Sequence, residues 1–281
     1  MAPSAQLQQR LLTAAVLVPL FLAAILWLPT PWVMTLFALV VAQGAWEWAG
    51  LAGFAGGLRL AYVIAIVLLL AVLGRFLNHP WLLWLLLGLA LTWWLIALAW
   101  IRRSETMALP VTGEAPSPML ALAGAVVLVP VWAALSVLHA NGSAGIGLLL
   151  TLLGIVWAAD SGAYFSGRRW GRHRLAPRIS PGKTREGAAG GVAAAVVVAL
   201  PAAWLLGFRG AALVGFVLLA VVTALFSIVG DLLESLLKRR RGVKDSGHLL
   251  PGHGGVLDRI DSLTAAAPVY VLGLMLQEVR L

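Results

Sequence analysis

The chain has 281 residues, of which 61% are hydrophobic and 11% are charged, and its mean hydropathy is +0.95. A soluble fold is excluded because an ordinary soluble domain is about half apolar and about a quarter charged. The absence of cysteine excludes disulfides, thiolate metal ligands and a cysteine nucleophile. The net charge of +9 favours basic loops beside a membrane and a site for anions over nucleic acid, since apolar segments separate most of the basic clusters.

Nine segments are apolar and long enough to cross a bilayer, which takes about 20 such residues. They are residues 11–28, 32–51, 60–76, 80–101, 118–138, 144–165, 187–206, 211–232 and 262–277. The first is longer than the apolar part of a secretion signal and lacks a cleavage site before Pro29, so we expect an uncleaved helix. These segments predict an all-α, polytopic integral membrane protein with a single membrane domain over residues 1–281.

The basic residues predict the orientation of these helices. With the N-terminus in the cytoplasm and nine crossings, 17 of the 20 Lys and Arg residues fall on the cytoplasmic side. This distribution agrees with the excess of Lys and Arg in cytoplasmic loops of membrane proteins. The two most basic stretches, residues 168–185 and 238–259, stay on one shared side even if one early helix is removed from the count.

The acidic residues also gather near the ends of the last four predicted helices. Seven of the 11 Asp and Glu residues lie between positions 160 and 261. Asp160 ends one apolar run, and Asp231 and Glu234 end another. Asp258 and Asp261 open the last helix with i, i+3 spacing, which places both carboxylates on one face. Ionised groups near hydrocarbon are costly, so they are usually paired, hydrated or functional.

Simple structural roles are open for several of these carboxylates. Asp261 could cap a helix. Asp231 and Glu234 could form ion pairs with Lys238 or Arg239 at helical spacing. As a group, however, aspartates beside so many basic residues are typical of a site that holds Mg²⁺ and polyphosphate. By contrast, the sequence Trp46-Glu47-Trp48 places a carboxylate inside an apolar helix, where we expect a buried hydrogen bond or a position at the interface.

Residues 235–261 contain a long and specific pattern. It reads Ser-x-apolar-Lys-Arg, four residues, Lys-Asp, and then Pro-x-His-Gly-Gly-apolar-x-Asp-Arg-x-Asp. This pattern resembles the signature of the phosphatidate cytidylyltransferase family. Residues 160–165, 180–187 and 230–235 also look like the family, so the resemblance is sharp over residues 160–261 and general before them.

The resemblance implies a nucleotidyltransferase of phospholipid biosynthesis in the bacterial cytoplasmic (inner) membrane. It would transfer CMP from CTP to phosphatidate, giving CDP-diacylglycerol and pyrophosphate. The active site would lie at the cytoplasmic ends of the C-terminal helices and face the cytoplasm. Its partners would be CTP, phosphatidate and the lipid bilayer, with Mg²⁺ as cofactor. A second metal ion and a homodimer are left open.

The candidate site residues follow from the matched positions. The expected catalytic residues are Lys244, Asp245, Asp258, Arg259 and Asp261. Those expected to bind substrate or phosphate are Lys183, Arg185, Ser235, Lys238, Arg239, His253, Gly254 and Gly255. Those expected to bind metal are Asp231, Asp245, Asp258 and Asp261, with Asp160 as a further candidate. The two glycines after His253 would let backbone amides approach a phosphate, although a simple turn would also explain them.

Two other functions fit parts of the sequence. A CTP-dependent polyprenol or phytol kinase would transfer the γ-phosphate and release CDP, but the complete His-Gly-Gly signature argues against it. A transporter would place ionisable residues near the middle of its helices, whereas here they gather at one face. Residues 144–281 would contain the catalytic helices and loops. Residues 1–143 carry no signature and would serve as a scaffold or a dimer surface.

Overall fold

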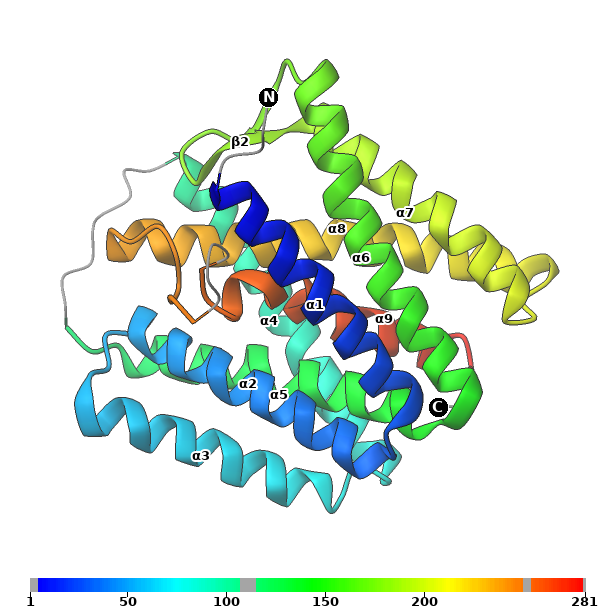
Figure 1. Cartoon of the computed structure of the whole chain (residues 1–281), viewed down its shortest axis with the longest axis horizontal. Coiled ribbons are helices and arrows are strands. Elements are labelled where there is room, and N and C mark those ends of the chain that lie inside the picture. The colour runs from blue at the N-terminus through cyan, green and yellow to red at the C-terminus, as the bar shows by residue number, and fades with distance from the viewer. Residues whose placement is uncertain (1–4, 107–114, 250–253, 280–281) are drawn as a thin grey trace.

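The computed structural model describes residues 5–106, 115–249 and 254–279, and these residues form nine helices and one two-stranded hairpin (Figure 1). The helices are α1 (Ala5–Trp27), α2 (Thr30–Leu51), α3 (Gly56–Gly74), α4 (Pro80–Thr106), α5 (Pro118–Ala140), α6 (Gly142–Trp170), α7 (Arg185–Leu205), α8 (Gly210–Arg241) and α9 (Leu257–Leu276). Eight of them, α2 to α9, are long and apolar enough to cross a membrane. The predicted all-α, polytopic architecture is confirmed, and each predicted segment overlaps one helix.

Local sequence signals account for several helix ends. The Ser117 side chain accepts a hydrogen bond from Leu120 N (3.3 Å) at the start of α5, just before Pro118. Thr184 caps α7 in the same way, accepting from Gly187 N at 3.0 Å. Both side chains satisfy amides that have no partner inside their helix. Helix α8 ends at Gly242, whose φ of +70° is a conformation that glycine adopts without strain.

Three helices extend at least five residues beyond their predicted C-terminal ends, all at the same end of the molecule. Helices α4, α6 and α8 have 27, 29 and 32 residues. A helix of 32 residues is about 48 Å long, whereas the hydrocarbon core of a bilayer is about 30 Å thick. The predicted ends at residues 101, 165 and 232 mark where apolar residues stop. The helices continue because a helix outside the hydrocarbon does not need apolar side chains.

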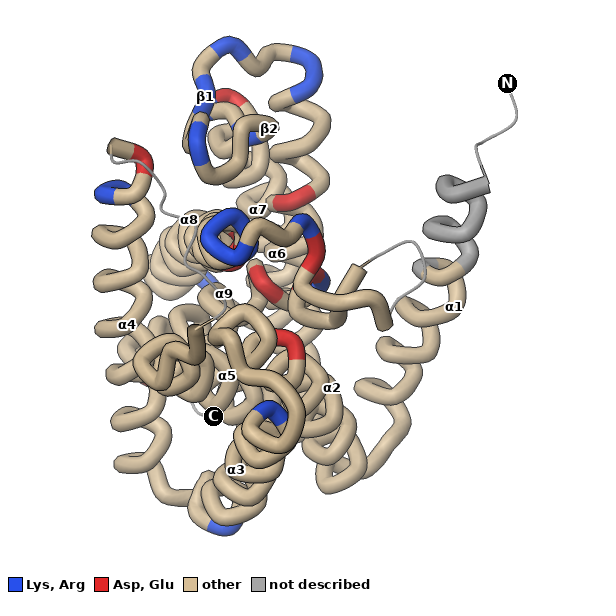
Figure 2. The backbone as a smooth tube through the Cα atoms, turned by 90° about the vertical axis from the view of Figure 1, so that its left-hand side faces the viewer, with Lys and Arg blue, Asp and Glu red and all other residues tan. Residues whose placement is uncertain are grey.

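The projecting helix ends and the loops between them form one charged end of the molecule. Figure 2 shows Lys, Arg, Asp and Glu residues around the hairpin and around the end of α8. Hydrogen bonds connect these parts: Arg241 Nε on α8 donates to Gly50 O on α2 (3.3 Å), and Ile179 N in the hairpin donates to Glu105 Oε1 on α4 (2.9 Å). We call this region the charged end.

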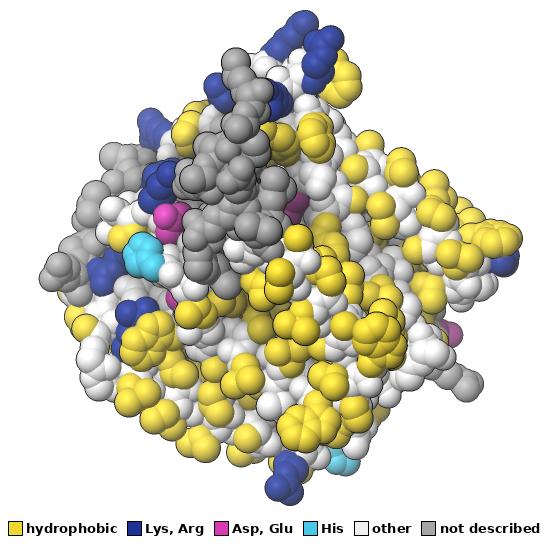
Figure 3. Space-filling view, viewed as in Figure 1, with side chains coloured by type: hydrophobic (Ala, Val, Ile, Leu, Met, Phe, Trp, Pro, Cys, Tyr) yellow, Lys and Arg dark blue, Asp and Glu magenta, His cyan; other side chains and the backbone are white. Residues whose placement is uncertain are grey.

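The remaining surface is largely apolar, as expected for helices in lipid. Figure 3 shows hydrophobic side chains spread over the face of the bundle away from the charged end. Helix α3 is an outer helix in which only Ile66 and Leu70 are buried, whereas α5 is buried over most of its length. Lipid is as apolar as the helix surfaces, so the hydrophobic effect does not drive helices together inside a membrane. Helices associate there through van der Waals contacts, which small residues make possible by letting the backbones approach closely.

Small residues bring α6 and α7 into close contact. A Cβ atom at Gly191 would lie 2.6 Å from Ala159 O, and one at Gly162 would lie 2.8 Å from Gly190 O. Both distances are too short for a side chain. This packing matters for the charged end because α6 leads into the hairpin and α7 follows it.

The hairpin itself was not predicted from the sequence. Strands β1 (Arg174–Ala176) and β2 (Ser180–Thr184) pair antiparallel, with Arg174 opposite Thr184 and Ala176 opposite Ser180. Strand β2 contains Pro181 and Gly182, which are rare inside strands and indicate a turn when read alone. Both strands lie in the connection between α6 and α7, and the local sequence gives no clear signal that they pair.

We predict that Gly191→Val lowers the free energy of unfolding by about 1–3 kcal/mol, since overpacking at a close helix contact costs this much. Thermal unfolding of the purified protein in detergent measures the change. Gly88→Val is the matched control because a Cβ atom there has no atom within 4 Å. Equal destabilisation by the two substitutions would contradict the close approach of α6 and α7.

We also predict that single cysteines at two exposed positions react from opposite sides of the membrane. Arg172 lies at the charged end between α6 and β1, and Asn78 lies in the turn between α3 and α4. Since the natural chain has no cysteine, Arg172→Cys and Asn78→Cys each carry one thiol. A membrane-impermeant thiol reagent, applied to intact cells and to inverted vesicles, measures the sidedness. Labelling of both from one side would contradict this arrangement of the helices.

Candidate active site

Two ion pairs join three different elements at the charged end. Lys238 Nζ on α8 lies 2.6 Å from Asp258 Oδ1 on α9 and 3.2 Å from Glu234 Oε2. Lys183 on β2 pairs with Asp231 on α8. The hairpin, the end of α8 and the start of α9 therefore meet at one place, although they are far apart in the sequence.

Hydrogen bonds fix Asp258 on both of its oxygens. While Oδ1 receives Lys238, Oδ2 accepts from Ser246 N (3.0 Å), Ser246 Oγ (3.0 Å) and Gly255 N (2.8 Å). The Asp258 side chain is only 6% exposed. A carboxylate this buried needs such donors to remain ionised. Asp258 thus orients Lys238 and also holds the loop that precedes α9.

A group of further carboxylates lies next to these ion pairs. Asp231 is close enough to Asp160 and Asp261 to interact electrostatically with both, and Ser235 Oγ donates to Asp231 Oδ1 at 3.3 Å. Glu234 interacts with both Asp258 and Asp261, as their i, i+3 spacing predicts. Carboxylates from α6, α8 and α9 therefore face one another at this end of the bundle.

Glu234 is the least satisfied member of this group. Its side chain is 3% exposed, and neither of its oxygens makes a hydrogen bond with a described residue. The 3.2 Å approach of Lys238 is a charge contact and lacks hydrogen-bond geometry. The predicted pair at helical spacing between Glu234 and Lys238 is confirmed. Buried carboxylate oxygens without donors are costly, so this site favours a further cation or donor.

The donor set suits a divalent cation of the Mg²⁺ type, although no ready-made metal site is present. Across residues 5–106, 115–249 and 254–279, no group of three or more His, Asp and Glu side chains is placed to hold a metal ion. Carboxylate oxygens are nevertheless the ligands that Mg²⁺ prefers, and neighbouring carboxylates of like charge gain stability from a cation between them. Asp231 interacts electrostatically with both Asp160 and Asp261, and the metal-binding roles expected for these three residues stay predictions.

Other predicted residues lie at the rim of this site. Arg185 and Arg239 are exposed, and Arg239 Nε makes a long hydrogen bond to Ile179 O in the hairpin (3.4 Å). Lys244 and Asp245 are exposed in the loop between α8 and α9. These positions are open to a substrate arriving from water, and their individual roles stay predictions.

Of two further predicted site residues, the structure describes Arg259 but not His253. Arg259, in the first turn of α9, is exposed and interacts electrostatically with Asp160. His253 lies outside the described residues. The roles expected for both stay predictions.

The glycines of the signature lie against carboxylates. Gly254 has a φ of +78°, and a Cβ atom there would lie 2.7 Å from Asp258 Oδ2. The amide of Gly255 donates to the same oxygen. The need for glycine at position 254 therefore has an explanation within the chain. Binding of a phosphate by Gly254 and Gly255 stays a prediction, with the Gly255 amide already engaged by Asp258.

Glu47 on α2 was not among the predicted site residues. It is 1% exposed, and its carboxylate accepts from Val256 N (3.0 Å) and Leu257 N (2.7 Å) at the start of α9. The expected buried hydrogen bond is confirmed. The sequence signal was a carboxylate in an apolar run, but its partners lie about 210 positions further along the chain.

Comparison with known proteins decides the family. The profile of the cytidylyltransferase family matches residues 8–276. The chain belongs to this family. A phosphatidate cytidylyltransferase from Pseudomonas aeruginosa is 42% identical to it, covering 94% of this chain and 95% of the relative. One from Haemophilus influenzae is 40% identical, covering 94% and 97%. The cytidylyltransferase match includes the N-terminal helices, where the sequence had no recognisable signature.

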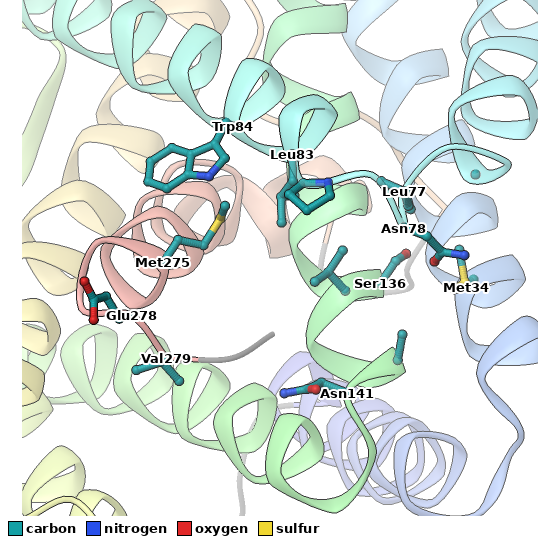
Figure 4. Close-up of a pocket in the computed structure, with 14 residues that line it drawn as sticks. Met34, Leu77, Asn78, Leu83, Trp84, Ser136, Asn141, Met275, Glu278 and Val279 are labelled. Atoms are coloured by element: carbon teal, nitrogen blue, oxygen red, sulfur yellow. The ribbon is translucent and has the colours of Figure 1, made fainter.

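Two cavities lie outside the group of carboxylates. One of about 570 Å³ is at the opposite end of the bundle, where Trp84, Met275 and Glu278 are among its lining residues (Figure 4). The other, of about 340 Å³, is lined by residues that include Arg168 and Arg174 and lies between α6 and the hairpin. The candidate site therefore rests on the ion pairs and the signature, not on the size of a cavity.

We predict that Lys238→Met lowers the free energy of unfolding by about 3 kcal/mol, since removing one partner of a buried ion pair leaves charge without compensation. Asp258 and Glu234 would both lose their cation. Denaturation in detergent measures the loss. Arg169→Met, at an exposed position at the end of α6, is the control and should change stability by less than about 0.5 kcal/mol. A Lys238 variant as stable as this control would argue against the ion-paired arrangement.

Proposed function

We propose that this chain transfers the CMP group of CTP to phosphatidate, forming CDP-diacylglycerol and pyrophosphate. One observation supports the proposal: two described parts of the 235–261 signature meet where Lys238 on α8 pairs with Asp258 on α9, at the ends of helices that are long and apolar enough to cross a membrane. The names of the full-length relatives support the same reaction. The site lies where a water-soluble nucleotide and a lipid can meet.

The chemistry requires charge neutralisation more than a strong base. A phosphate oxygen of phosphatidate attacks the α-phosphorus of CTP and forms a new P–O bond. The bond from that phosphorus to the oxygen bridging to the β-phosphorus breaks, and pyrophosphate leaves with the electron pair. The nucleophile is already anionic, so no proton has to be removed. The enzyme must bring two polyanions together in line and stabilise the charge that develops.

The basic residues of the site suit this task. Lys238 is held by Asp258 and Glu234, and Lys183 is brought to α8 by the hairpin. Fixed cations of this kind neutralise phosphate without reorganisation during the reaction. We assign binding of the triphosphate, the leaving pyrophosphate or the lipid phosphate to a set of cations: Lys183, Arg185, Lys238, Arg239, Lys244 and Arg259.

Mg²⁺ is part of the proposal as a cofactor. When bound, it would supply positive charge to the phosphate oxygens, with Asp231, Asp261 and Asp160 as ligands and Asp245 and Asp258 as ligands or supports. The close carboxylates and the unsatisfied oxygens of Glu234 support this assignment. A second metal ion stays a prediction.

We further propose that the protein resides in the bacterial inner membrane with its charged end in the cytoplasm. CTP is cytoplasmic, and most Lys and Arg residues lie at the charged end, in agreement with the positive-inside rule. Labelling of Arg172→Cys only in inverted vesicles is the expected result. A homodimer stays a prediction: the exposed apolar face of α3 could be covered by lipid or by a second copy.

The alternatives receive less support. A CTP-dependent polyprenol or phytol kinase is not favoured, because the full-length relatives are named for cytidylyl transfer. A transporter would need ionisable groups near the middle of its helices. Here the ion pairs that join different helices lie at one end of the bundle.

We predict that the purified protein, given Mg²⁺, phosphatidate and CTP labelled at the α-phosphate, transfers the label to lipid and releases pyrophosphate. Asp258→Ala should lower this rate by about 100-fold, since displacement of a positioned group by about 1 Å has an effect of this size. Glu278→Gln, which changes an exposed carboxylate at the opposite end, should retain the activity.

Other outcomes of this assay are equally informative. If label at the γ-phosphate moves to a polyprenol and CDP is released, the kinase is the correct function. If a folded wild-type protein transfers neither label, the proposed function is wrong.

A further inference from the structure

The buried carboxylate of Glu47 has four hydrogen-bond donors among the described residues. Oε1 accepts from Gln43 Nε2 (2.9 Å) and Val256 N (3.0 Å), and Oε2 accepts from Leu257 N (2.7 Å) and Ser246 Oγ (3.0 Å). Three of these donors belong to the signature segment, whereas Glu47 belongs to α2. One side chain from the N-terminal part of the chain therefore holds two separate parts of the signature.

All four partners are neutral donors, which explains why the side chain must be a carboxylate. Each oxygen receives one backbone N–H, so a glutamine in either orientation would place its NH₂ group against an N–H of α9. The N-terminus of α9 also stabilises a negative charge through the helix dipole. Glutamate thus offers two acceptor oxygens for these amides, whereas the isosteric glutamine offers only one.

Ser246 connects Glu47 to Asp258. Its hydroxyl shares one proton between Glu47 Oε2 and Asp258 Oδ2, each 3.0 Å away, and its amide donates to that same Asp258 oxygen. Gly255, whose amide binds Asp258, directly precedes the two residues whose amides bind Glu47. The two carboxylates therefore hold the same two short segments.

Two glycines of the signature segment are explained by Glu47. A Cβ atom at Gly247 would lie 2.6 Å from Glu47 Oε1, and one at Gly255 would lie 2.3 Å from Glu47 Oε2. A side chain at either position would displace the Glu47 carboxylate from its hydrogen bonds. The presence of glycine at these positions is an observation independent of the hydrogen bonds, and it leads to the same residue.

We propose that Glu47 is a positioning residue of the active site: it fixes Ser246 and residues 255–257 so that Asp258 is held against Lys238. The inference rests on the proposed function only where activity is measured. It gives α2 a direct part in the site. It also implies that the amides of residues 255–257 are not available to a phosphate, because Asp258 and Glu47 already accept from them.

The test compares Glu47→Gln and Glu47→Asp with the wild-type chain, with Glu278→Gln as the matched control for loss of a carboxylate. Steady-state kinetics with CTP and phosphatidate give kcat and KM. Hydrogen exchange measures protection of the amides of Val256 and Leu257 without reference to activity. We expect Glu47→Gln to lower kcat by about 10- to 100-fold, the range typical of groups that orient active-site ligands, with a smaller effect on either KM.

In the same variant the two amides should lose protection, while the remainder of α9 keeps it. Glu47→Asp retains an acceptor and should recover part of both properties. The control should match the wild type in kcat and in exchange.

A double-mutant cycle separates positioning from a general structural role. If Glu47 acts through Ser246, the combined effect of Glu47→Gln and Ser246→Ala on kcat should be clearly smaller than the product of the single effects. Independent effects on kcat would overturn the proposal. So would wild-type exchange in Glu47→Gln, or a loss of protection spread evenly over α2 and α9. If the wild type shows no cytidylyl transfer but Glu47→Gln exposes these amides selectively, the proposed function fails and the positioning role holds.

Discussion

The ion pair between Lys238 and Asp258 is the interaction on which the charged end depends. It joins the end of α8 to the start of α9 across a loop of the chain, and its carboxylate also holds Ser246 and Gly255. An enzyme for two polyanions needs fixed cations at the membrane surface, but unpaired cations beside apolar helices are costly. Pairing Lys238 with two carboxylates keeps its ammonium group ionised and oriented at the end of the bundle.

Loops at the end of a helical bundle have no hydrophobic core of their own, and three glutamates supply the order that a core would give. Glu47 accepts the successive amides of Val256 and Leu257. Glu105 accepts those of residues 178–179, and Glu186 those of residues 172–173. Each glutamate lies on a helix, and each pair of amides lies in a loop or at a helix start beside the site. Hydrogen bonds to side chains on the helices thus fix the conformation of the segments that carry charged side chains.

The sequence predicts the helices well because hydropathy reports directly on the apolar surface that lipid requires. It also places Lys238 and Asp258 in one candidate site, since both lie within one continuous signature, and the structure pairs them. It does not predict the partners of Glu47, because hydrogen bonds between α2 and α9 leave no pattern at a fixed spacing. The hairpin is missed for a related reason: Pro181 and Gly182 indicate a turn locally, and only pairing with β1 makes the segment a strand.

The alternation of side chains along β2 has a consequence for how this family can change in evolution. Lys183 reaches Asp231 on one side of the strand, whereas its neighbours Gly182 and Thr184 line the hollow next to α6 on the other. Because successive residues of a strand point to opposite faces, a length change that shifts Lys183 by one position along β2 would direct the cation away from α8. Length changes of two residues would preserve its side. The hairpin should therefore tolerate substitutions more readily than length changes that move Lys183 to the other face of β2.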